Sequence, residues 1–300
     1  MSTDNLDVEA GGNALPELPA NVGHETRIIV AVNESGGSVK TTTVAALAAI
    51  AAEEGLDVLA IEADSQRDLA HLLGCDDPDA NEDIATLFDV VDGIATLDEA
   101  IIPARRGEGG PVIPNLWFVP GSRRLKELDD KLSGAMLREL WFQRIVQGAL
   151  GRFHVIFIDC PGDLKLTTKG ALLASKDVEV MACVKSQEKE ARALTELEAT
   201  LTEMNAAFAA LGVQLGIDWI VIGESVSDKS QGKAYTDAEE QLREAYGELV
   251  LTPSVRRSIK VPEAYSAQTP VPLYAPRSEP SLQYREIAAG MGLTKASFTA

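Results

Sequence analysis

Cysteine is scarce in this chain, and the few cysteines lie far apart. The sequence has three, Cys75, Cys160 and Cys183, and none belongs to a C-x-x-C pair. An odd number of separated cysteines argues against a disulfide framework, and the missing pair argues against a metal knuckle. We therefore expect all three to be small core residues.

Long apolar runs are missing as well. No stretch of about 18 apolar residues occurs, which is the length that a membrane-spanning helix needs. The first residues also lack the basic and then apolar pattern of a secretory signal. The sequence therefore predicts a cytoplasmic protein that has no membrane as a partner.

Positive charge is in short supply. The chain carries 27 Lys and Arg against 46 Asp and Glu, a formal net charge of −19. This balance argues against extensive coating of nucleic acid, which needs clustered basic side chains, but it is compatible with a local basic patch. Residues 1–25 have five acids and no Lys or Arg, which predicts a flexible acidic tail.

Beyond residue 25 the chain alternates strand and helix patterns. Apolar runs typical of strands buried on both faces occur at 26–32, 57–62, 115–119, 153–158, 178–184, 217–222 and 249–252. Helical patterns that end at a glycine occupy 42–54, 135–150, 188–211 and 236–246. The alternation predicts an α/β fold, a mostly parallel twisted sheet flanked by helices on both faces. We expect one domain over residues 26–300, with residues 105–114 as a surface loop.

A glycine-rich turn follows the first predicted strand and opens the first predicted helix. Residues 35–42 read Ser-Gly-Gly-Ser-Val-Lys-Thr-Thr. Backbone N–H groups and the positive helix end would converge there, as in a phosphate-binding loop. Lys40 would reach the β- and γ-phosphates and Thr41 would ligate Mg²⁺; the alternative is an ordinary helix start with Lys40 in solvent. The candidate nucleotide-binding residues are Gly36, Gly37, Ser38, Val39, Lys40, Thr41 and Thr42.

Val39 departs from the usual phosphate-loop pattern, which has glycine immediately before the lysine. A β-branched residue keeps its N–H but resists positive φ. We therefore expect this loop to hold a conformation that valine accepts, or to be strained there.

Two acids, Glu62 and Asp64, follow the next predicted strand, which we expect to lie beside the loop strand. Ligands bind at the carboxyl edge of parallel strands. If the strand continued through Asp64, period-two spacing would point both carboxylates the same way. Asp64 is a candidate catalytic and metal-site residue, because a carboxylate there can orient the attacking water or hold metal-bound water. The alternative is a solvated acid at a strand end.

A third element is the apolar run that ends in Asp159 and continues as Cys-Pro-Gly. It resembles a Walker B element, whose Asp holds Mg²⁺ directly or through water. The Pro161-Gly162 turn suits a switch loop beside a γ-phosphate. Loop, acid pair and strand Asp in this order together indicate a site for a polyphosphate and Mg²⁺.

These motifs resemble the ParA/MinD family of P-loop NTPases, which has a deviant Walker A sequence, and most closely its ParA partition branch. The resemblance covers about residues 26–292. Residues 35–42 are similar to the family's Lys-Gly-Gly-Val-Gly-Lys-Thr-Thr, and residues 62–66 to its Asp-x-Asp-Pro-Gln. Residues 119–122 are similar to the segment before Walker B, and residues 255–276 to the C-terminal tail that helps to enclose the base and face DNA.

The resemblance implies an ATPase that binds ATP and Mg²⁺. It assigns Lys40 to the phosphates, Thr41 and Asp159 to the metal, and Asp64 to hydrolysis. It further implies an ATP-dependent homodimer that binds DNA nonspecifically and associates with the nucleoid. A ParB-like DNA-binding or adaptor protein would stimulate hydrolysis and reset it, with a plasmid or chromosome as cargo.

Ser35 stands where the family has its signature lysine, which crosses the dimer to the partner's ATP. Serine cannot supply that charge. Another cation could take the role, and Lys165 after the Walker B element is the candidate substitute, unless it is an ordinary exposed lysine. Otherwise the dimer hydrolyses ATP very slowly, or the protein is a nucleotide-gated binder without useful turnover.

Basic residues near one predicted edge of the sheet are candidate DNA contacts, unless they are merely solvated. They are Arg256, Arg257, Lys260, Lys229 and Lys233.

Three other classes share the ATP switch. A protein-cargo positioning ATPase remains an alternative. A MinD-like membrane positioner is less favoured, because residues 286–300 have one Lys and no Arg, whereas it needs a basic amphipathic terminal helix. The nitrogenase iron-protein class is discarded, because neither Cys75 nor Cys160 lies in a Gly-flanked ligand pattern.

Overall fold

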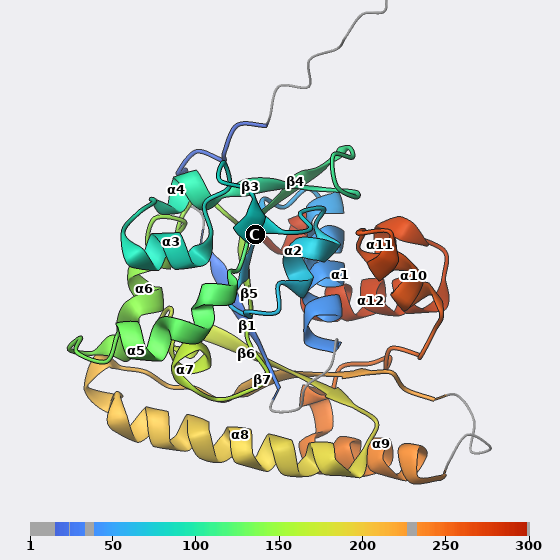
Figure 1. The fold of residues 1–300 in the computed structure, drawn as a ribbon. Helices are drawn as coiled ribbons and strands as arrows, with labels where there is room; N and C mark the ends of the chain where they lie inside the picture. The colour runs from blue at the N-terminus through green and yellow to red at the C-terminus, as the bar shows by residue number, and fades with distance from the viewer. Residues whose placement is uncertain (1–15, 24, 34–38, 227–232, 299–300) are drawn as a thin grey trace, which may run out of the picture.

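A seven-stranded sheet forms the centre of the described part of the chain (Figure 1). The computed structural model describes residues 16–23, 25–33, 39–226 and 233–298. Across the sheet the strands follow the order β3-β4-β2-β5-β1-β6-β7, and all neighbours are parallel except β3 and β4. The predicted α/β fold with a mostly parallel sheet is confirmed. The strands are β1 Arg27–Val32, β2 Val58–Glu62, β3 Ile102–Arg105, β4 Val112–Val119, β5 Val155–Asp159, β6 Val178–Lys185 and β7 Ile217–Gly223.

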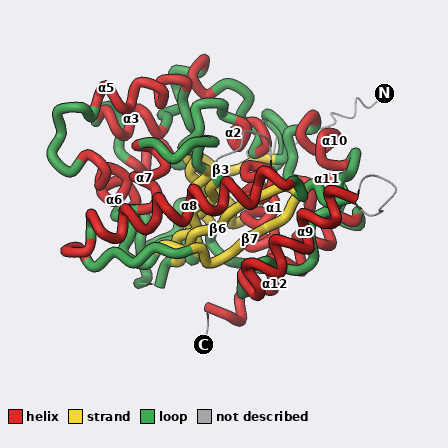
Figure 2. The backbone as a smooth tube through the Cα atoms, turned by 90° about the horizontal axis from the view of Figure 1, so that it is seen from below, coloured by secondary structure: helices red, strands yellow, loops and turns green. Residues whose placement is uncertain are grey.

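Helices cover both faces of the sheet, because successive strand residues are apolar on both sides (Figure 2). One face carries α1 Val39–Glu53, α2 Asp68–Leu72, α10 Lys260–Ser266, α11 Val271–Tyr274 and α12 Glu279–Gly290. The other carries α3 Leu87–Asp92, α4 Leu97–Ala100, α5 Leu128–Lys131, α6 Trp141–Val146, α7 Leu166–Leu172, α8 Glu188–Ala207 and α9 Lys233–Tyr246.

Helix α1 is the most deeply buried helix that the structure describes in full. All its residues except Glu53 are buried, between the sheet on one side and α11 and α12 on the other. A helix that is apolar all round needs such a position, and its alanines allow close approach. The helix begins at Val39, three residues before the predicted start. Burial of its first turn determines where Lys40 and Thr41 lie.

The predicted strand at 249–252 is wrong. Residues 247–249 form a single 3₁₀ turn, and Val250 makes only an isolated bridge to Ile220. The segment still runs beside β7, with Leu251 N–H donating to the Ile220 carbonyl. Pro253 follows and lacks the N–H that a ladder needs, so pairing does not extend into an eighth strand.

Two other predictions need correction. The helix predicted at 135–150 is broken: Leu137 has a φ of 51°, a 3₁₀ turn follows, and α6 covers only Trp141–Val146. The loop predicted at 105–114 is shorter than expected: residues 106–111 form the loop, which joins β3, ending at Arg105, to β4, starting at Val112. Pro103 and Arg105 interrupt the apolar pattern of β3, which concealed this edge strand.

Three glycines end helical segments as predicted, among them Gly247, which follows α9 with a φ of 54°. Gly55 follows α1 with a φ of 85°, and Gly212 closes the region of α8 with a φ of 73°. These values lie in the left-handed region that favours glycine. All three cysteines are free and buried, as expected. Within the described ranges, no helix combines the length and hydrophobicity needed to cross a membrane.

The end of the predicted acidic tail contacts the domain. Arg152 Nε donates to the Pro19 carbonyl at 3.1 Å, and Val22 N–H donates to the Gly151 carbonyl at 3.1 Å. Leu18 packs against the core. Residues 1–15 lie outside the described residues.

Candidate nucleotide site

Three neighbouring strands end at the candidate site. β1, β5 and β2 are adjacent and parallel, so their carboxyl ends meet at one edge of the sheet. The register places Ala31 and Glu62 on either side of Asp159. Because β5 lies between β1 and β2, the expectation that β2 lies beside β1 was wrong. Crossover connections allow strands that are consecutive in sequence to take separate places in the sheet.

Asp159 and Thr41 form the centre of this edge. The Thr41 hydroxyl donates to Asp159 Oδ2 at 2.7 Å, and both side chains are buried. Asp159 Oδ1 is buried with no hydrogen-bond partner. Desolvation by burial raises the pKa of Asp159 to about 7. A buried, half-satisfied carboxylate beside a hydroxyl fits a hard cation such as Mg²⁺, which prefers oxygen ligands.

The residues described do not form a complete protein cage for a metal. No group of three or more His, Cys, Asp or Glu gathers in the described ranges to hold one. Mg²⁺ in nucleotide sites takes one or two protein oxygens and completes its shell with water and phosphate. The Thr41 and Asp159 oxygens therefore suit a metal that arrives with a nucleotide.

Lys40 is the second residue of α1 and is only 4% exposed. Burial raises the pKa of both Asp159 and Asp64, and the Lys40 ammonium opposes that rise in both. The structure therefore places one buried cation close to two carboxylates at the start of α1. Lys40 is therefore not a solvated lysine at an ordinary helix start, which was the alternative.

Glu62 and Asp64 have different surroundings, because β2 ends at Glu62 and does not continue through Asp64. The Glu62 carboxylate is fully buried and accepts N–H bonds from Leu69 at 2.7 Å and Gly121 at 2.9 Å. Burial raises its pKa to about 8, although these N–H bonds oppose the rise. Asp64 lies in the following loop, half-buried, and accepts the Gln66 N–H at 2.9 Å.

Sequence reasoning missed the role of Glu62 and of Gly121. Glu62 joins the start of α2 and the loop after β4 to the end of β2. A Cβ on Gly121 would lie 2.7 Å from the Asp64 carbonyl oxygen, so only glycine allows this approach. The Pro-Gly pair before Ser122 signals a turn but does not say which carboxylate it meets.

A cavity of about 850 Å³ opens beside the start of α1. Val39 and Thr42 form one wall, and Gly223 and Glu224 at the end of β7 form another. The segment from Val255 through α10 completes the lining. Tyr284 of α12 also lines it, and its hydroxyl lies 3.2 Å from the Thr43 hydroxyl. The C-terminal part of the chain therefore encloses a space next to Lys40.

The wall of this cavity is joined to the Asp64 region. Tyr265 of α10 donates its hydroxyl to Asp68 Oδ1 at 2.7 Å. The His71 ring lies 4.4 Å from the Tyr265 ring, and His71 Nε2 lies 3.0 Å from the Tyr265 carbonyl oxygen. Neither Tyr265 nor Tyr284 was a predicted site residue. For Tyr265 the sequence signal was the similarity of residues 255–276 to the ParA tail, and Tyr284 lies beyond that segment.

Several predicted site residues lie outside the described residues: Ser35, Gly36, Gly37, Ser38 and Lys229. Lys233 is described only as the first residue of α9. Lys165 is 73% exposed and lies 3.4 Å from Asp163. It lines a small cavity together with Ser65, so the structure places it near the Asp64 loop.

The remaining candidate DNA contacts lie along the rim of the large cavity. Arg256 and Arg257 line it, and Lys260 begins α10. Arg256 donates to the Val226 carbonyl at 2.5 Å, and Lys260 pairs with Glu263 at 2.7 Å. Arg257 is exposed, so its guanidinium is available to a partner at this edge.

Comparison with known proteins identifies relatives. Residues 26–210 match the AAA domain family AAA_31. The chain is 27% identical over 263 residues to the sporulation initiation inhibitor protein Soj of Bacillus subtilis, covering 87% of this chain and 96% of Soj. It is 27% identical over 256 residues to a putative replication protein A of Rhizobium rhizogenes. That match covers 81% of this chain but spans only 60% of the relative.

A solved structure has the same fold. Cobyrinic acid a,c-diamide synthase from Mycobacterium smegmatis, with bound ADP and magnesium, is similar with a TM-score of 0.69. The identity is 23%, and the match covers 88% of this chain and 93% of that chain. Together with the family match over most of the described sheet, these similarities show that the chain belongs to the ParA/MinD family of P-loop ATPases and is homologous to the Soj/ParA partition ATPases.

Proposed function

We propose that this protein is a partition or positioning ATPase that binds ATP and Mg²⁺ and dimerises around the nucleotide. In its ATP state it binds DNA nonspecifically, and slow, partner-stimulated hydrolysis resets it. The observation that carries the proposal is the Thr41–Asp159 pair, with its unpartnered Asp159 Oδ1, beside the buried Lys40. A buried carboxylate oxygen that lacks a hydrogen-bond partner calls for a ligand, and a metal ion that arrives with the phosphates would supply one.

The site gives the nucleotide one orientation, with its phosphates at the start of α1 and its nucleoside in the neighbouring cavity. The start of α1 directs N–H groups and the positive helix end at one place, where Lys40 adds a charge for the polyphosphate. The cavity of about 850 Å³ next to it has the size of a small-molecule site and would receive the nucleoside.

Thr41 and Asp159 would hold Mg²⁺, which when bound supplies charge neutralisation at the phosphate oxygens. Asp64, on the loop after β2, is half-buried and close enough to Lys40 for the ammonium charge to oppose the rise in the pKa of its carboxyl. Its carboxylate would orient the attacking water. Glu62 holds that loop in place through the N–H bonds of Leu69 and Gly121.

Serine at position 35 predicts slow hydrolysis, since one transition-state contact is missing. We expect Ser35→Lys to raise the rate of phosphate release at saturating ATP and Mg²⁺ by at least about 10-fold, because a single such contact contributes about 10²–10³ in rate. If Lys165 substitutes for the missing cation, Lys165→Ala slows the natural protein but not the Ser35→Lys variant. An unchanged rate and unchanged dimer lifetime in Ser35→Lys would place residue 35 away from the phosphates.

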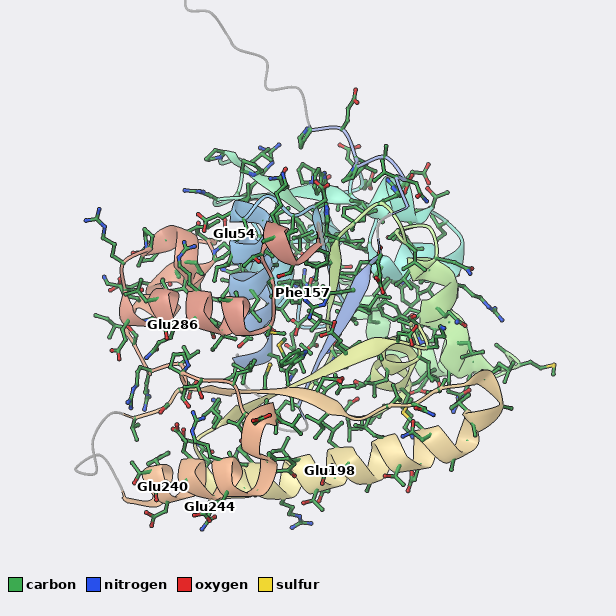
Figure 3. The ribbon with its side chains drawn as sticks, turned by 180° about the vertical axis from the view of Figure 1, so that it is seen from behind. Glu54, Phe157, Glu198, Glu240, Glu244 and Glu286 are labelled. Atoms are coloured by element: carbon green, nitrogen blue, oxygen red, sulfur yellow. The ribbon has the colours of Figure 1, made fainter. Side chains whose placement is uncertain are left out.

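The charge distribution favours DNA contact at the cavity rim. Glu198 on α8 and Glu240 and Glu244 on α9 lie on the outer layer that these two helices form, where acidic side chains repel phosphate (Figure 3). Arg257 at the rim is exposed. A duplex would therefore meet the edge that carries Arg256, Arg257 and Lys260.

We expect Arg257→Ala to weaken ATP-dependent DNA binding and to reduce the slope of log affinity against log salt by about 1, as loss of one phosphate contact does. Fluorescence anisotropy of a labelled random duplex over a salt series measures both quantities. The matched control is Arg192→Ala on α8, whose side chain is 84% exposed. Equal losses in the two variants would contradict a DNA-binding edge at the rim.

A further inference from the structure

Val39 and Gly223 are packed directly on each other, although they lie far apart in the sequence. A Cβ built on Gly223 would lie 2.7 Å from Val39 Cγ1, 3.4 Å from Cγ2 and 3.6 Å from Cβ. Contacts under about 3 Å are not tolerated between carbon atoms, so the valine occupies the space that any larger residue at 223 would need. Val39 is correspondingly only 5% exposed.

Space, not backbone freedom, requires glycine at this position. Gly223 is absent from the described residues with positive φ, so an alanine could adopt its backbone conformation. Gly223 is the last residue of β7, and Glu224, which follows it, has a φ of 51° and turns the chain into the cavity wall. The missing side chain at 223 therefore serves the packing of Val39.

The contact links the phosphate-binding end of α1 to the edge of the sheet. β7 lies two strands away from β1, the strand that leads into α1. Val39 is the first residue of α1, immediately before Lys40 and Thr41. Valine has one strongly preferred side-chain rotamer in a helix, so it acts as a stiff spacer between α1 and β7.

We propose that Val39 is a positioning residue for the nucleotide: seated on Gly223, it fixes the first turn of α1 relative to β7 and to the nucleoside cavity. Lys40 and Thr41 are thereby held at a set distance from the cavity wall formed by Gly223 and Glu224. This role replaces the flexible glycine that usually precedes the lysine. The inference rests on the proposed function, because it deepens the same ATP site.

The test is a double-substitution experiment in which isothermal titration calorimetry measures the affinity for ATP in the presence of Mg²⁺. The proteins compared are the natural chain, Gly223→Ala, Val39→Gly and the double variant. Gly216→Ala is the matched control, because Gly216 precedes the same strand and no atom lies within 4 Å of its would-be Cβ. Thermal unfolding without nucleotide reports whether each variant is folded at the titration temperature.

We expect Gly223→Ala to weaken ATP binding at least about 10-fold, the scale of an overpacked contact. Val39→Gly in the same chain should restore the affinity to within about threefold of Val39→Gly alone, and Gly216→Ala should bind as the natural protein does. A purely structural role would lower the unfolding temperature of Gly223→Ala and leave the ATP affinity of the folded protein unchanged; that result overturns the inference.

Two further outcomes decide the remaining cases. If Gly223→Ala does not fold, the double variant takes its place: recovered folding and ATP affinity support the matched pair, and persistent loss of affinity overturns it. If the natural protein itself does not bind ATP, the proposed function fails. If it does bind and Gly223→Ala binds equally well, only this inference fails.

Discussion

Lys40→Ala is expected to abolish measurable ATP binding at micromolar nucleotide, with affinity at least about 100-fold lower. Lys40 is buried at the start of α1, where its charge acts on both Asp64 and Asp159. Without it, phosphate charge would meet the two carboxylates without the buried cation that opposes their charge. A single hydrogen bond to a charged group contributes about 1.5–3 kcal/mol, and Lys40 would reach two phosphates.

Calorimetric titration with ATP and Mg²⁺ measures this effect. Lys176→Ala is the control, because Lys176 is 72% exposed and precedes β6, at the sheet edge opposite the site. Thermal unfolding shows whether the Lys40→Ala protein is folded. Equal ATP affinity in folded Lys40→Ala and in the natural protein would overturn the phosphate-loop assignment.

Asp64→Ala is expected to keep ATP binding within about threefold and to lower the hydrolysis rate at least about 100-fold. Asp64 lies on the loop after β2, and it is only half-buried, so its loss leaves the fold in place. Its carboxylate would act on the attacking water and not on the bound nucleotide, so the rate changes more than the affinity.

Phosphate release and calorimetry separate the two quantities. Asp177→Ala is the control, since Asp177 is 77% exposed and lies beside Lys176 at the opposite edge. A folded Asp64→Ala protein that hydrolyses ATP at the natural rate would remove Asp64 from the reaction. A loss of affinity as large as the loss of rate would make Asp64 a binding residue instead.

The sheet was predictable because its strands are buried on both faces. The runs that end at Val32 and Asp159 are apolar on successive residues, a pattern that is typical of strands in a parallel sheet covered on both sides. Gly55 and Gly212 then showed where helical segments end. Strand order was less accessible, because β5 enters between β1 and β2 through contacts between distant parts of the chain.

The irregular elements were hidden for local reasons. Pro253 prevents a ladder where apolar residues suggested a strand, and Leu137 leaves the helical region where the pattern suggested a continuous helix. In both places the apolar pattern was real, but it reflects burial against neighbours and not regular secondary structure.

The site also has a part that the sequence predicted and a part that only the folded structure shows. Lys40, Thr41 and Asp159 carry recognisable motifs, and the structure brings them to one edge. The hydrogen bonds of Glu62 and the packing of Val39 on Gly223 depend on which segments meet in three dimensions. No single segment of sequence contains that information, so these contacts appeared only in the folded protein.

The most direct test of the ATP switch is DNA binding by the purified protein with ATP, with ADP and without nucleotide. The series is repeated over a range of salt concentrations, and light scattering measures the mass of the protein in parallel. We predict binding that requires ATP, weakens steeply with salt and accompanies a doubling of mass. A dimer that forms with ATP and ignores DNA would contradict the partition account and favour a protein cargo.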